Sequence, residues 1–522
     1  MGRYVQCLPW LVPLVYVAAA FGALHHRQFW RVLTAACGAA LALALGNLVL
    51  DIAFGMHRPG ADSAPVAAVV IVLIAFLGWV IARYSRTNLA REPGERRYVL
   101  ALLLTFASVA VVVATENLAV LILAWAASSA TLHQLLTFYP DRPGARIAAR
   151  KQFLASRLAE LCLLAAAALL YAHWGTLDLA ALDRGATASA APPQSIQLAG
   201  ALIGAAVLLK SAQLPLHSWL VEVMEAPTSV SALLHAGVVN LGGYVLIRLA
   251  PLISASPAAR ILLVAVGGAT AVLAGLTMMT CSSIKVRLAW STCSQMGLMA
   301  VECGLGLYDL ALLHLLAHAL YKAHAFLSSG EAVRTSNARR LAPAARTGAG
   351  TIGRSAPLLA APVAVLLLGA SAFLWHAALH IEPLSWVGGL ICALGIATLF
   401  WTGGHTLGTY LRNICLALLG VQLYLAWHVA IARGLGVTAV SGTPLLCAWA
   451  AVCFLALYLM QWSVLRPARP AWVDRLLTWA AAGYFLDQPL TRLVTGPWPP
   501  RAAPLAFTRT ASRLAQREGG AA

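Results

Sequence analysis

Apolar stretches of about 20 residues recur from one end of this chain to the other, and short polar or basic segments separate them. An α-helix of about that length crosses the hydrocarbon core of a bilayer. The pattern predicts an all-α polytopic membrane protein of about 13–15 transmembrane helices, with no separate soluble domain of any size. The first stretch lacks a small-residue cleavage site, so we expect it to be a retained span and not a signal peptide.

About fifteen stretches are long and apolar enough to be spans. They lie approximately at 8–24, 32–54, 64–84, 98–115, 117–138, 153–173, a seventh beginning near Leu198, and then 228–252, 258–280, 287–306, 309–332, 355–379, 384–404, 412–434 and 443–465. This spacing divides the chain into N-terminal transmembrane helices at 1–97, a transmembrane core at 98–332, a cytoplasmic basic linker at 333–354, C-terminal transmembrane helices at 355–465 and a basic cytoplasmic tail at 466–522.

Charged residues make up only 10% of the chain, yet the formal net charge is +18. Basic residues of membrane proteins gather in cytoplasmic loops, so this excess indicates topology and not nucleic-acid binding. The first, third and fifth loops hold most of the early basic residues, namely Arg27, Arg31, Arg83, Arg86, Arg91, Arg96, Arg97, Arg142, Arg146, Arg150 and Lys151. We therefore expect the odd loops and the C-terminus to be cytoplasmic and the N-terminus to lie outside.

Lys210 follows an apolar run that begins at Leu198, and it opens the segment Lys210-Ser-Ala-Gln-Leu-Pro-Leu-His. A charge at bilayer depth costs about 3 kcal/mol on insertion scales, so such residues commonly mark function. Pro215 interrupts the same helix, and freed backbone groups survive at that depth only against protein or a water-filled cavity. A broken helix beside a buried lysine indicates an ion site. The alternative is a proline kink used only for packing.

A second apolar helix carries His314, His318 and Lys322 at every fourth position, so the three side chains share one face over about 12 Å. Neutral imidazoles accept and donate protons, and a lysine removed from water gives up its proton more easily. The row predicts a proton relay, although single histidines in apolar helices are often only hydrogen-bonded packing residues. Asp309 is expected to cap this helix.

The neighbouring spans offer further candidates for the same path. His235, one span after Lys210, is predicted to bridge Lys210 to the helix of the second lysine. Lys285 begins a span and is either part of the path or a basic anchor at the membrane surface. A buried lysine needs a carboxylate or a cavity, and the candidate charge partners are Glu160 and Glu222.

Ten cysteines are scattered through the chain, mostly within apolar helices, and no Cys-x-x-Cys pair occurs. We interpret them as small apolar residues and expect neither an iron–sulfur nor a zinc framework. His314 and His318 have metal-ligand spacing but lack a third ligand. Because no nucleophile triad, phosphate loop or haem motif is present, the sequence predicts a transporter subunit with no metal or cofactor of its own, not an enzyme.

Two segments resemble the antiporter-like subunits of respiratory complex I and of Mrp antiporters. One runs from Lys210 through Met224-Glu-Ala-Pro-Thr-Ser-Val-Ser-Ala-Leu-Leu-His-Ala, and the other comprises Ile284-Lys-Val-Arg-Leu-Ala-Trp-Ser-Thr-Cys-Ser-Gln-Met-Gly and the histidine–lysine row after it. The resemblance covers about 98–332 and implies the antiporter-like subunit fold, with a hydrated proton path along the membrane midplane. It also implies that Lys210 is the lysine of the broken helix, His235 its bridge and Lys322 the central lysine.

Three departures separate this chain from the complex I subunits. The family usually carries a glutamate after the tryptophan of the fifth span, where this chain has Ala126 after Trp125. Complex I relatives also carry a lysine or glutamate in a second broken helix, where this chain offers only His376 and His380. The long lateral helix of the distal complex I subunit is missing as well, so we do not expect a standard complex I role.

The segment from Thr131-Leu-His-Gln-Leu-Leu-Thr-Phe-Tyr-Pro to Pro143 resembles the DabB family, the membrane subunits of bacterial two-part inorganic carbon transporters. That resemblance implies a bacterial inner-membrane location and a large DabA-like partner, similar to a zinc β-carbonic anhydrase. In such a complex, H⁺ or Na⁺ flow through this chain would drive one-way hydration of CO2 to bicarbonate on the partner, which would hold the zinc.

Two other functions stay open at this point. A subunit of an NADH–quinone oxidoreductase-type proton pump, or of a multisubunit cation/proton antiporter, would use the same path with other partners. A structural membrane scaffold with a degenerate channel is favoured only by Ala126. The identity of the co-purifying subunit distinguishes the first of these from an inorganic carbon transporter.

Overall fold

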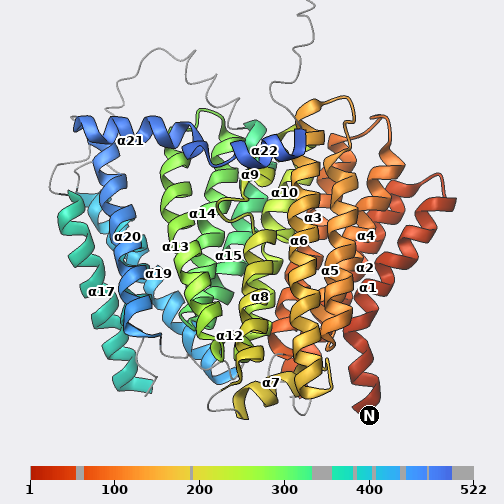
Figure 1. The fold of residues 1–522 in the computed structure, drawn as a ribbon, viewed down its shortest axis with the longest axis horizontal. Coiled ribbons are helices and arrows are strands. Elements are labelled where there is room, and N and C mark those ends of the chain that lie inside the picture. The colour runs from red at the N-terminus through yellow and green to blue at the C-terminus, as the bar shows by residue number, and fades with distance from the viewer. Residues whose placement is uncertain are drawn as a thin grey trace, which may run out of the picture.

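The computed structural model describes residues 2–54, 64–188, 192–331, 356–379, 385–401, 407–434, 442–466 and 469–495. Within these ranges the helices stand side by side as a bundle, and two short helices lie across one of its faces (Figure 1). The only strand-like pairing in the described ranges is an isolated bridge between Asn117 and Asp178. The all-α polytopic fold predicted from the hydrophobic pattern is confirmed.

The first part of the chain forms α1 (Gly2–His25), α2 (Phe29–Phe54), α3 (Ala64–Asn88), α4 (Glu95–Ala114), α5 (Leu118–Leu136), α6 (Pro143–Trp174), α7 (Leu179–Ala188), α8 (Gln194–Lys210), α9 (Ser218–Glu222) and η1 (Val223–Glu225). It continues with α10 (Thr228–Leu233), η2 (Leu234–Val238), α11 (Leu241–Arg248), α12 (Ala250–Ser254), α13 (Pro257–Thr280), α14 (Ile284–Gly304) and α15 (Tyr308–Leu327). The last part forms α17 (Ala356–Leu379), α18 (Trp386–Ala397), η3 (Thr398–Phe400), α19 (Leu407–Gly434), α20 (Pro444–Leu465), α21 (Ala471–Ala481), η4 (Gly483–Phe485) and α22 (Gln488–Thr495).

Among the described residues, 11 helices are long and apolar enough to cross a membrane. Shorter apolar helices accompany them, and α8 is one of these. The break predicted in the seventh span is present, because α8 ends at Lys210 and α9 begins only at Ser218. Pro215 lies in the intervening segment, so the lysine stands at the point where the helix stops.

Local sequence sets the helix ends that position the polar groups. Asn117 caps α5 by accepting hydrogen bonds from the backbone N–H of Ala119 at 2.9 Å and of Val120 at 3.3 Å. Pro143 opens α6, where its missing N–H has no cost, and Gly175 ends it with a left-handed φ of 66°. The resulting helix of 32 residues is long enough to carry side chains from one membrane face past the middle of the bilayer.

The span formed by α10, η2 and α11 lies at the centre of the bundle. In the most apolar 18-residue stretch of this span, 89% of the residues are buried, compared with 22% in the corresponding stretch of Leu359–Leu379 in α17. Buried apolar residues from α1 to α15 form one continuous core, and α17 to α20 pack as a smaller cluster against α13, α14 and α15. Polar groups that face the central span are therefore shielded from lipid.

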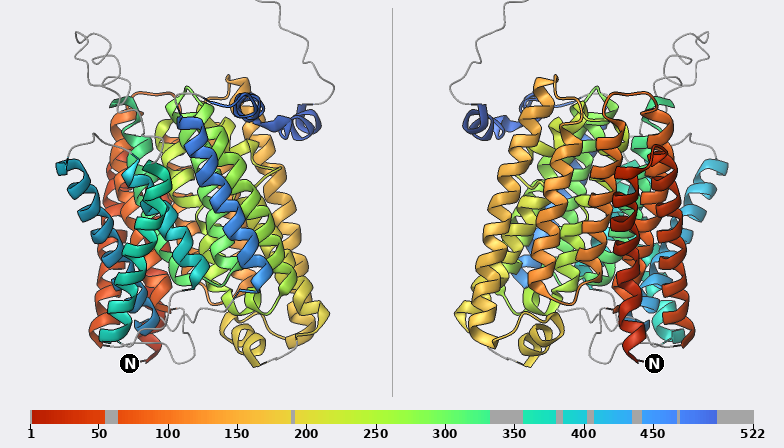
Figure 2. Two further views of the ribbon diagram at one scale, coloured as in Figure 1. Left: turned by 90° about the vertical axis from the view of Figure 1, so that its left-hand side faces the viewer. Right: turned by 90° about the vertical axis from the view of Figure 1, so that its right-hand side faces the viewer.

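The chain after α20 folds back over the bundle. α21 packs on α13 and α22 packs on α6, so both lie across the face where α9 is found (Figures 1 and 2). The turn between them uses left-handed φ values of 60° at Gly483, 55° at Tyr484 and 56° at Phe485. Part of the predicted cytoplasmic tail is thus folded, whereas the predicted linker at 333–354 lies outside the described residues. The N-terminus lies at the opposite face (Figure 1), as an odd number of spans requires, and the assignment of sides stays a prediction.

Helices α13 and α14 approach each other closely at Gly267 and Gly297. A Cβ added to Gly297 would meet the Gly267 carbonyl oxygen at 2.6 Å and the Ala271 backbone nitrogen at 2.9 Å, and neither backbone atom can rotate away. We expect Gly297→Ala to destabilise the protein by about 1–3 kcal/mol and to lower its unfolding temperature in detergent. Gly38→Ala in α2 is the control, because nothing lies within 4 Å of its added Cβ. An unfolding temperature of the Gly297 variant at or above that of the control would contradict the close contact.

Candidate functional site

Lys210 is buried at the end of α8, in contact with two other helices. Its Nζ donates hydrogen bonds to Ser129 Oγ at 2.8 Å and to the Trp125 carbonyl oxygen at 3.2 Å, both on α5. The ammonium lies 4.8 Å from the centre of the Trp125 ring and 3.6 Å from Oε1 of Glu160 on α6. Removing an ammonium from water without partners costs several kcal/mol. These three side chains therefore provide the environment that Lys210 needs.

The carboxylate beside Lys210 comes from α6 and not from α5. On α5 the position that resembled the family's glutamate holds Ala126, and Ser129, three residues on, contacts the lysine instead. Glu160 Oε1 also accepts a hydrogen bond from Arg157 Nη2 at 2.8 Å. One carboxylate thus serves two cations, and the structure places Glu160 where the sequence analysis expected a charge partner.

Lys322 and His318 lie one turn apart on α15, and both are buried. Lys322 Nζ donates to the Leu288 carbonyl oxygen of α14 at 3.0 Å. His318 Nδ1 is 3.0 Å from Oδ1 of Asn240 in the central span, and the amide of Asn240 donates to the Ala236 carbonyl oxygen at 2.8 Å. Because that bond turns the amide oxygen toward the ring, Nδ1 carries the proton and Nε2 is the basic nitrogen.

His235 lies in η2, a π-helical turn in the central span. Turns of this kind are frequent at functional sites. Its buried ring stacks on Phe326 of α15 with 4.4 Å between ring centroids, and neither ring nitrogen has a hydrogen-bond partner among the described residues. The ring is within electrostatic range of Lys322 and His318. It therefore reaches the Lys322 side as predicted, while the predicted bridge to Lys210 is not a direct hydrogen bond.

His314, the third member of the row, pairs with an acid that the sequence analysis missed. Its Nδ1 lies 3.0 Å from Oε2 of Glu302, a carboxylate of α14 that is only 2% exposed. The rings of His314 and His318 lie 5.9 Å apart. A single carboxylate within an apolar helix was the available signal, and its pairing depends on how α14 packs against α15.

Asp309 has a different role from the predicted one. The residue before α15 is Leu307, so Asp309 lies inside the first turn and is not the N-cap. Its Oδ2 is 2.5 Å from Nδ1 of His428 on α19, and its backbone carbonyl accepts a hydrogen bond from Trp427 Nε1 at 3.1 Å. The expectation of a cap was wrong because the helix begins one residue before Asp309, and an imidazole on another helix contacts the carboxylate.

The remaining candidates lie outside this row. Lys285, half-buried at the start of α14, donates to Thr228 Oγ1 at 2.8 Å, a position that suits an anchor and a path residue alike. Glu222 bonds to Lys151 and not to Lys210. The region of the expected second broken helix forms the continuous helix α17, which carries His376, while residue 380 lies outside the described ranges.

Ionisable side chains with little or no exposure lie on α6, α8, the central span, α15, α14 and α19, and each contacts or lies near a member of the set on another of these elements. Figure 1 shows the helices that carry them. They are Glu160, Lys210, His235, Lys322, His318, His314, Glu302, Asp309 and His428; seven are buried, and the side chains of His314 and His428 are 10% and 12% exposed. We refer to this set as the buried polar row. Among the described residues no three His, Cys, Asp or Glu side chains converge as a metal site.

Comparison with known proteins places this geometry in context. Residues 115–373 match the family described as NADH:quinone oxidoreductase/Mrp antiporter, TM. The chain is 50% identical over 277 residues to the probable inorganic carbon transporter subunit DabB of Hydrogenovibrio crunogenus, which covers 53% of this chain and 54% of that protein. It is 43% identical over 288 residues to subunit DabB2 of Halothiobacillus neapolitanus, covering 55% of this chain and 52% of that protein.

The chain is also similar to a respiratory subunit. It is 35% identical over 266 residues to NADH-quinone oxidoreductase subunit L of Mycobacterium tuberculosis, covering 50% of this chain and 42% of that protein. The chain thus spans about half the length of the curated relatives it matches.

Solved structures share the fold at low sequence identity. The Mrp complex from Dietzia matches 98% of this chain and 60% of the compared chain, with a TM-score of 0.54 and 23% identity. The membrane-bound sulfane sulfur reductase, an archaeal respiratory membrane complex, matches 94% of this chain and 99% of the compared chain, with a TM-score of 0.56 and 18% identity. Both confirm an antiporter-like arrangement of helices.

The Lys210–Glu160 pair predicts a stability difference between buried and exposed carboxylates. We expect Glu160→Gln to lower the unfolding temperature in detergent, because it leaves a buried ammonium without its carboxylate, a loss of about 3 kcal/mol. Glu225→Gln is the control, since Glu225 pairs with Arg142 at 3.5 Å with both side chains about half exposed; such pairs contribute about 0–1 kcal/mol. Equal unfolding temperatures for the two variants would show that Glu160 does not stabilise Lys210.

Proposed function

We propose that this chain is the cation-conducting membrane subunit of an inorganic carbon uptake complex. The proposal is supported by the match of residues 115–373 to the NADH:quinone oxidoreductase/Mrp antiporter family and by the similarity to DabB subunits. In this proposal H⁺ or Na⁺ flows through the chain and drives CO2 hydration on a DabA-like partner. The membrane is the bacterial inner membrane, with the face that carries α22 in the cytoplasm.

The observation that carries the proposal is the buried polar row. Ionisable side chains are rare within membrane spans because each must be desolvated, and they mark ion pathways and proton relays. Here nine of them follow one another through six neighbouring elements instead of lying singly. A purely structural subunit would gain nothing from desolvating so many ionisable side chains. The row therefore argues against the structural scaffold that Ala126 alone favoured.

Each part of the row has a chemical task in the proposed conduction. Glu160 and Ser129 hold the Lys210 ammonium at the break of α8. A cation that neutralises Glu160 weakens its attraction for the Lys210 ammonium. The proton that Lys210 then releases passes by way of His235 to Lys322. His318, with Nε2 as its basic nitrogen, and His314 then carry it toward Glu302 and Asp309.

Zinc belongs to the partner in this proposal. Zinc hydroxide would supply the nucleophile for CO2 hydration there. Within the described part of this chain, His314 and His318 are engaged by Glu302 and Asn240, and no third ligand converges on them. This chain's contribution is the cation flow, which makes the hydration one-way by coupling it to the membrane gradient.

Substitution of the two lysines tests the proposed transport. In a strain that lacks carbonic anhydrase and expresses this chain with its partner, we expect Lys210→Ala and Lys322→Ala to abolish growth in air. Each removes a protonatable group from the path, and such groups typically contribute about 100-fold or more. Arg184→Gln, an exposed substitution on α7, should grow like the wild type. Full rescue by both lysine variants at normal expression would overturn the proposal.

The partner separates the proposed function from its alternative. Affinity purification of the full chain from its native membrane is expected to recover a large zinc-containing subunit. Recovery of quinone-reductase subunits, or of small antiporter subunits, would instead assign the chain to a respiratory proton pump or a cation/proton antiporter. The similarity to NADH-quinone oxidoreductase subunit L is the observation that keeps this alternative in view.

A further inference from the structure

A second charged centre lies at the face of the bundle that carries α22. Lys151 of α6 has no exposed surface, and its Nζ donates to Glu222 Oε1 at 2.6 Å and to the two carboxylate oxygens of Asp487 at 2.8 and 3.0 Å. Glu222 ends α9, the helix that follows the break, and Asp487 immediately precedes α22. Three segments far apart in the chain therefore meet at one ammonium.

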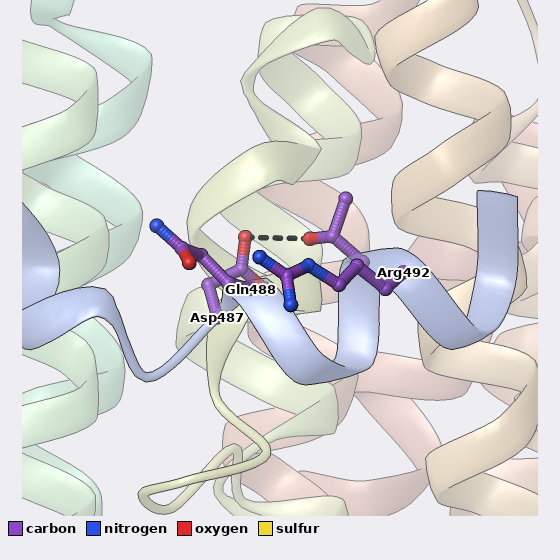
Figure 3. Close-up of a pocket in the computed structure, with 4 residues that line it drawn as sticks. Asp487, Gln488 and Arg492 are labelled. Atoms are coloured by element: carbon purple, nitrogen blue, oxygen red, sulfur yellow. Dashed lines mark hydrogen bonds between the residues drawn. The ribbon is translucent and has the colours of Figure 1, made fainter. Parts of the chain in front are cut away.

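The charge of this centre is unbalanced. Two carboxylates share one ammonium, so the cluster carries one excess negative charge when both acids are ionised. Asp487 Oδ2 also accepts a hydrogen bond from Thr491 Oγ1 at 2.9 Å (Figure 3). Glu222 Oε2 is buried and has no partner among the described residues. Uptake of one proton on Glu222 would neutralise the cluster and give that oxygen a hydrogen to donate.

The two acids are correspondingly distinct. Burial raises the pKa of Glu222 to about 7, outweighing the hydrogen bond from Lys151, and neighbouring Asp487 adds to the rise. Burial also raises the pKa of Asp487, but its hydrogen bonds, of which the one from Lys151 has the largest effect, lower it more. The pKa of Asp487 therefore lies below its ordinary value. The environment thus separates a permanent anion from an acid that changes its protonation near neutral pH.

We propose that Lys151, Glu222 and Asp487 form a proton-exchange site, with Glu222 as the group that takes up and releases the proton between the solution at the α22 face and the Lys210 centre. The inference rests on the proposed function and names the point where protons reach its path. A proton suits the site better than Na⁺, because the ammonium of Lys151 already occupies the position between the two carboxylates.

A polar stripe on α6 connects this site to Lys210. Gln152 directly follows Lys151, and Gln152, Ser156 and Glu160 are four residues apart, so these three share one helix face over about 12 Å. All three are buried. Gln152 Nε2 donates to Ser156 Oγ at 3.0 Å, and Gln152 Oε1 has no partner among the described residues. At its far end the stripe reaches Glu160, 3.6 Å from Lys210 Nζ.

The opposite side of the site is open to solution. A hollow at the bundle face is lined by Asp487, which precedes α22, and by Gln488, Thr491 and Arg492 of α22 (Figure 3). Other charged or titratable groups also lie near Glu222. The buried His217 is within electrostatic range of both Lys151 and Asp487. Arg492 lines the hollow, and the Arg142–Glu225 pair is exposed. α22 therefore forms one wall of the access route and supplies its fixed anion.

The test measures proton flux against pH in proteoliposomes that contain the purified full chain with its co-purified subunits, using an internal pH dye and a potassium diffusion potential. Flux from the α22 face should fall as the pH on that side rises through about 7, because Glu222 is then deprotonated and no longer loaded. Glu222→Gln should lower flux about tenfold or more and abolish that pH dependence, while Glu222→Asp keeps both in part.

Asp487→Asn gives a second, independent readout. Removing this anion takes away an influence that raises the pKa of Glu222, so the flux profile should move to lower pH. Glu225→Gln is the control, because Glu225 lies three residues after Glu222 and its side chain is about half exposed. Its flux and pH profile should match those of the wild type. Lys210→Ala in the same assay tests the proposed function itself.

The outcomes separate the two ideas. Loss of flux in the Lys210 variant together with wild-type flux and pH profile in Glu222→Gln would overturn the exchange site and leave the conduction proposal standing. Wild-type flux in the Lys210 variant would overturn conduction. If Glu222→Gln does not fold, an unshifted profile in Asp487→Asn would overturn the exchange site.

Discussion

The structure depends on one electrostatic constraint, which is that an ammonium buried in an apolar bundle must be matched by a carboxylate and by hydrogen-bond acceptors. Lys210 stands at the end of α8 because the helix breaks there, and the break leaves it facing α5 and α6. On α5, the position where the resemblance to antiporter-like subunits implies a glutamate holds Ala126. The chain meets the constraint with Glu160 of α6, whose Oε1 lies 3.6 Å from Lys210 Nζ. The polar stripe on α6 follows from the same placement.

Local patterns allowed much of the fold to be predicted. Runs of apolar residues define helices in lipid because each backbone group must be satisfied within its own segment, and a proline beside a lysine marked the break. The face shared by His314, His318 and Lys322 followed from helical periodicity alone. These features need no knowledge of which helix lies beside which.

The partners of these residues could not be predicted, because each depends on packing between distant segments. Lys151 and Asp487 are 336 positions apart, and Asp309 and His428 are 119 apart. Lys151 was assigned to a basic loop from its charge alone, whereas the structure buries it completely. Glu302 and Asn240 escaped notice for the same reason, since nothing in their own neighbourhood indicates the imidazole that each contacts.

The distribution of charge along the row bears on how it works. Carboxylates stand at both ends, with Glu160 at one and Glu302 and Asp309 at the other. Lys322, between them, bonds to a backbone carbonyl, and the titratable groups within electrostatic range of it are His235, His318 and the Cys293 thiol. A cation is therefore attracted at the two ends and repelled in the middle, so the row offers no deep central site in which an ion would be trapped. His428 and Asp487 lie beyond residues 115–373. The imidazole that completes the row at one end, and one of the three side chains of the exchange site beyond the other end, therefore come from outside the region that matches the family.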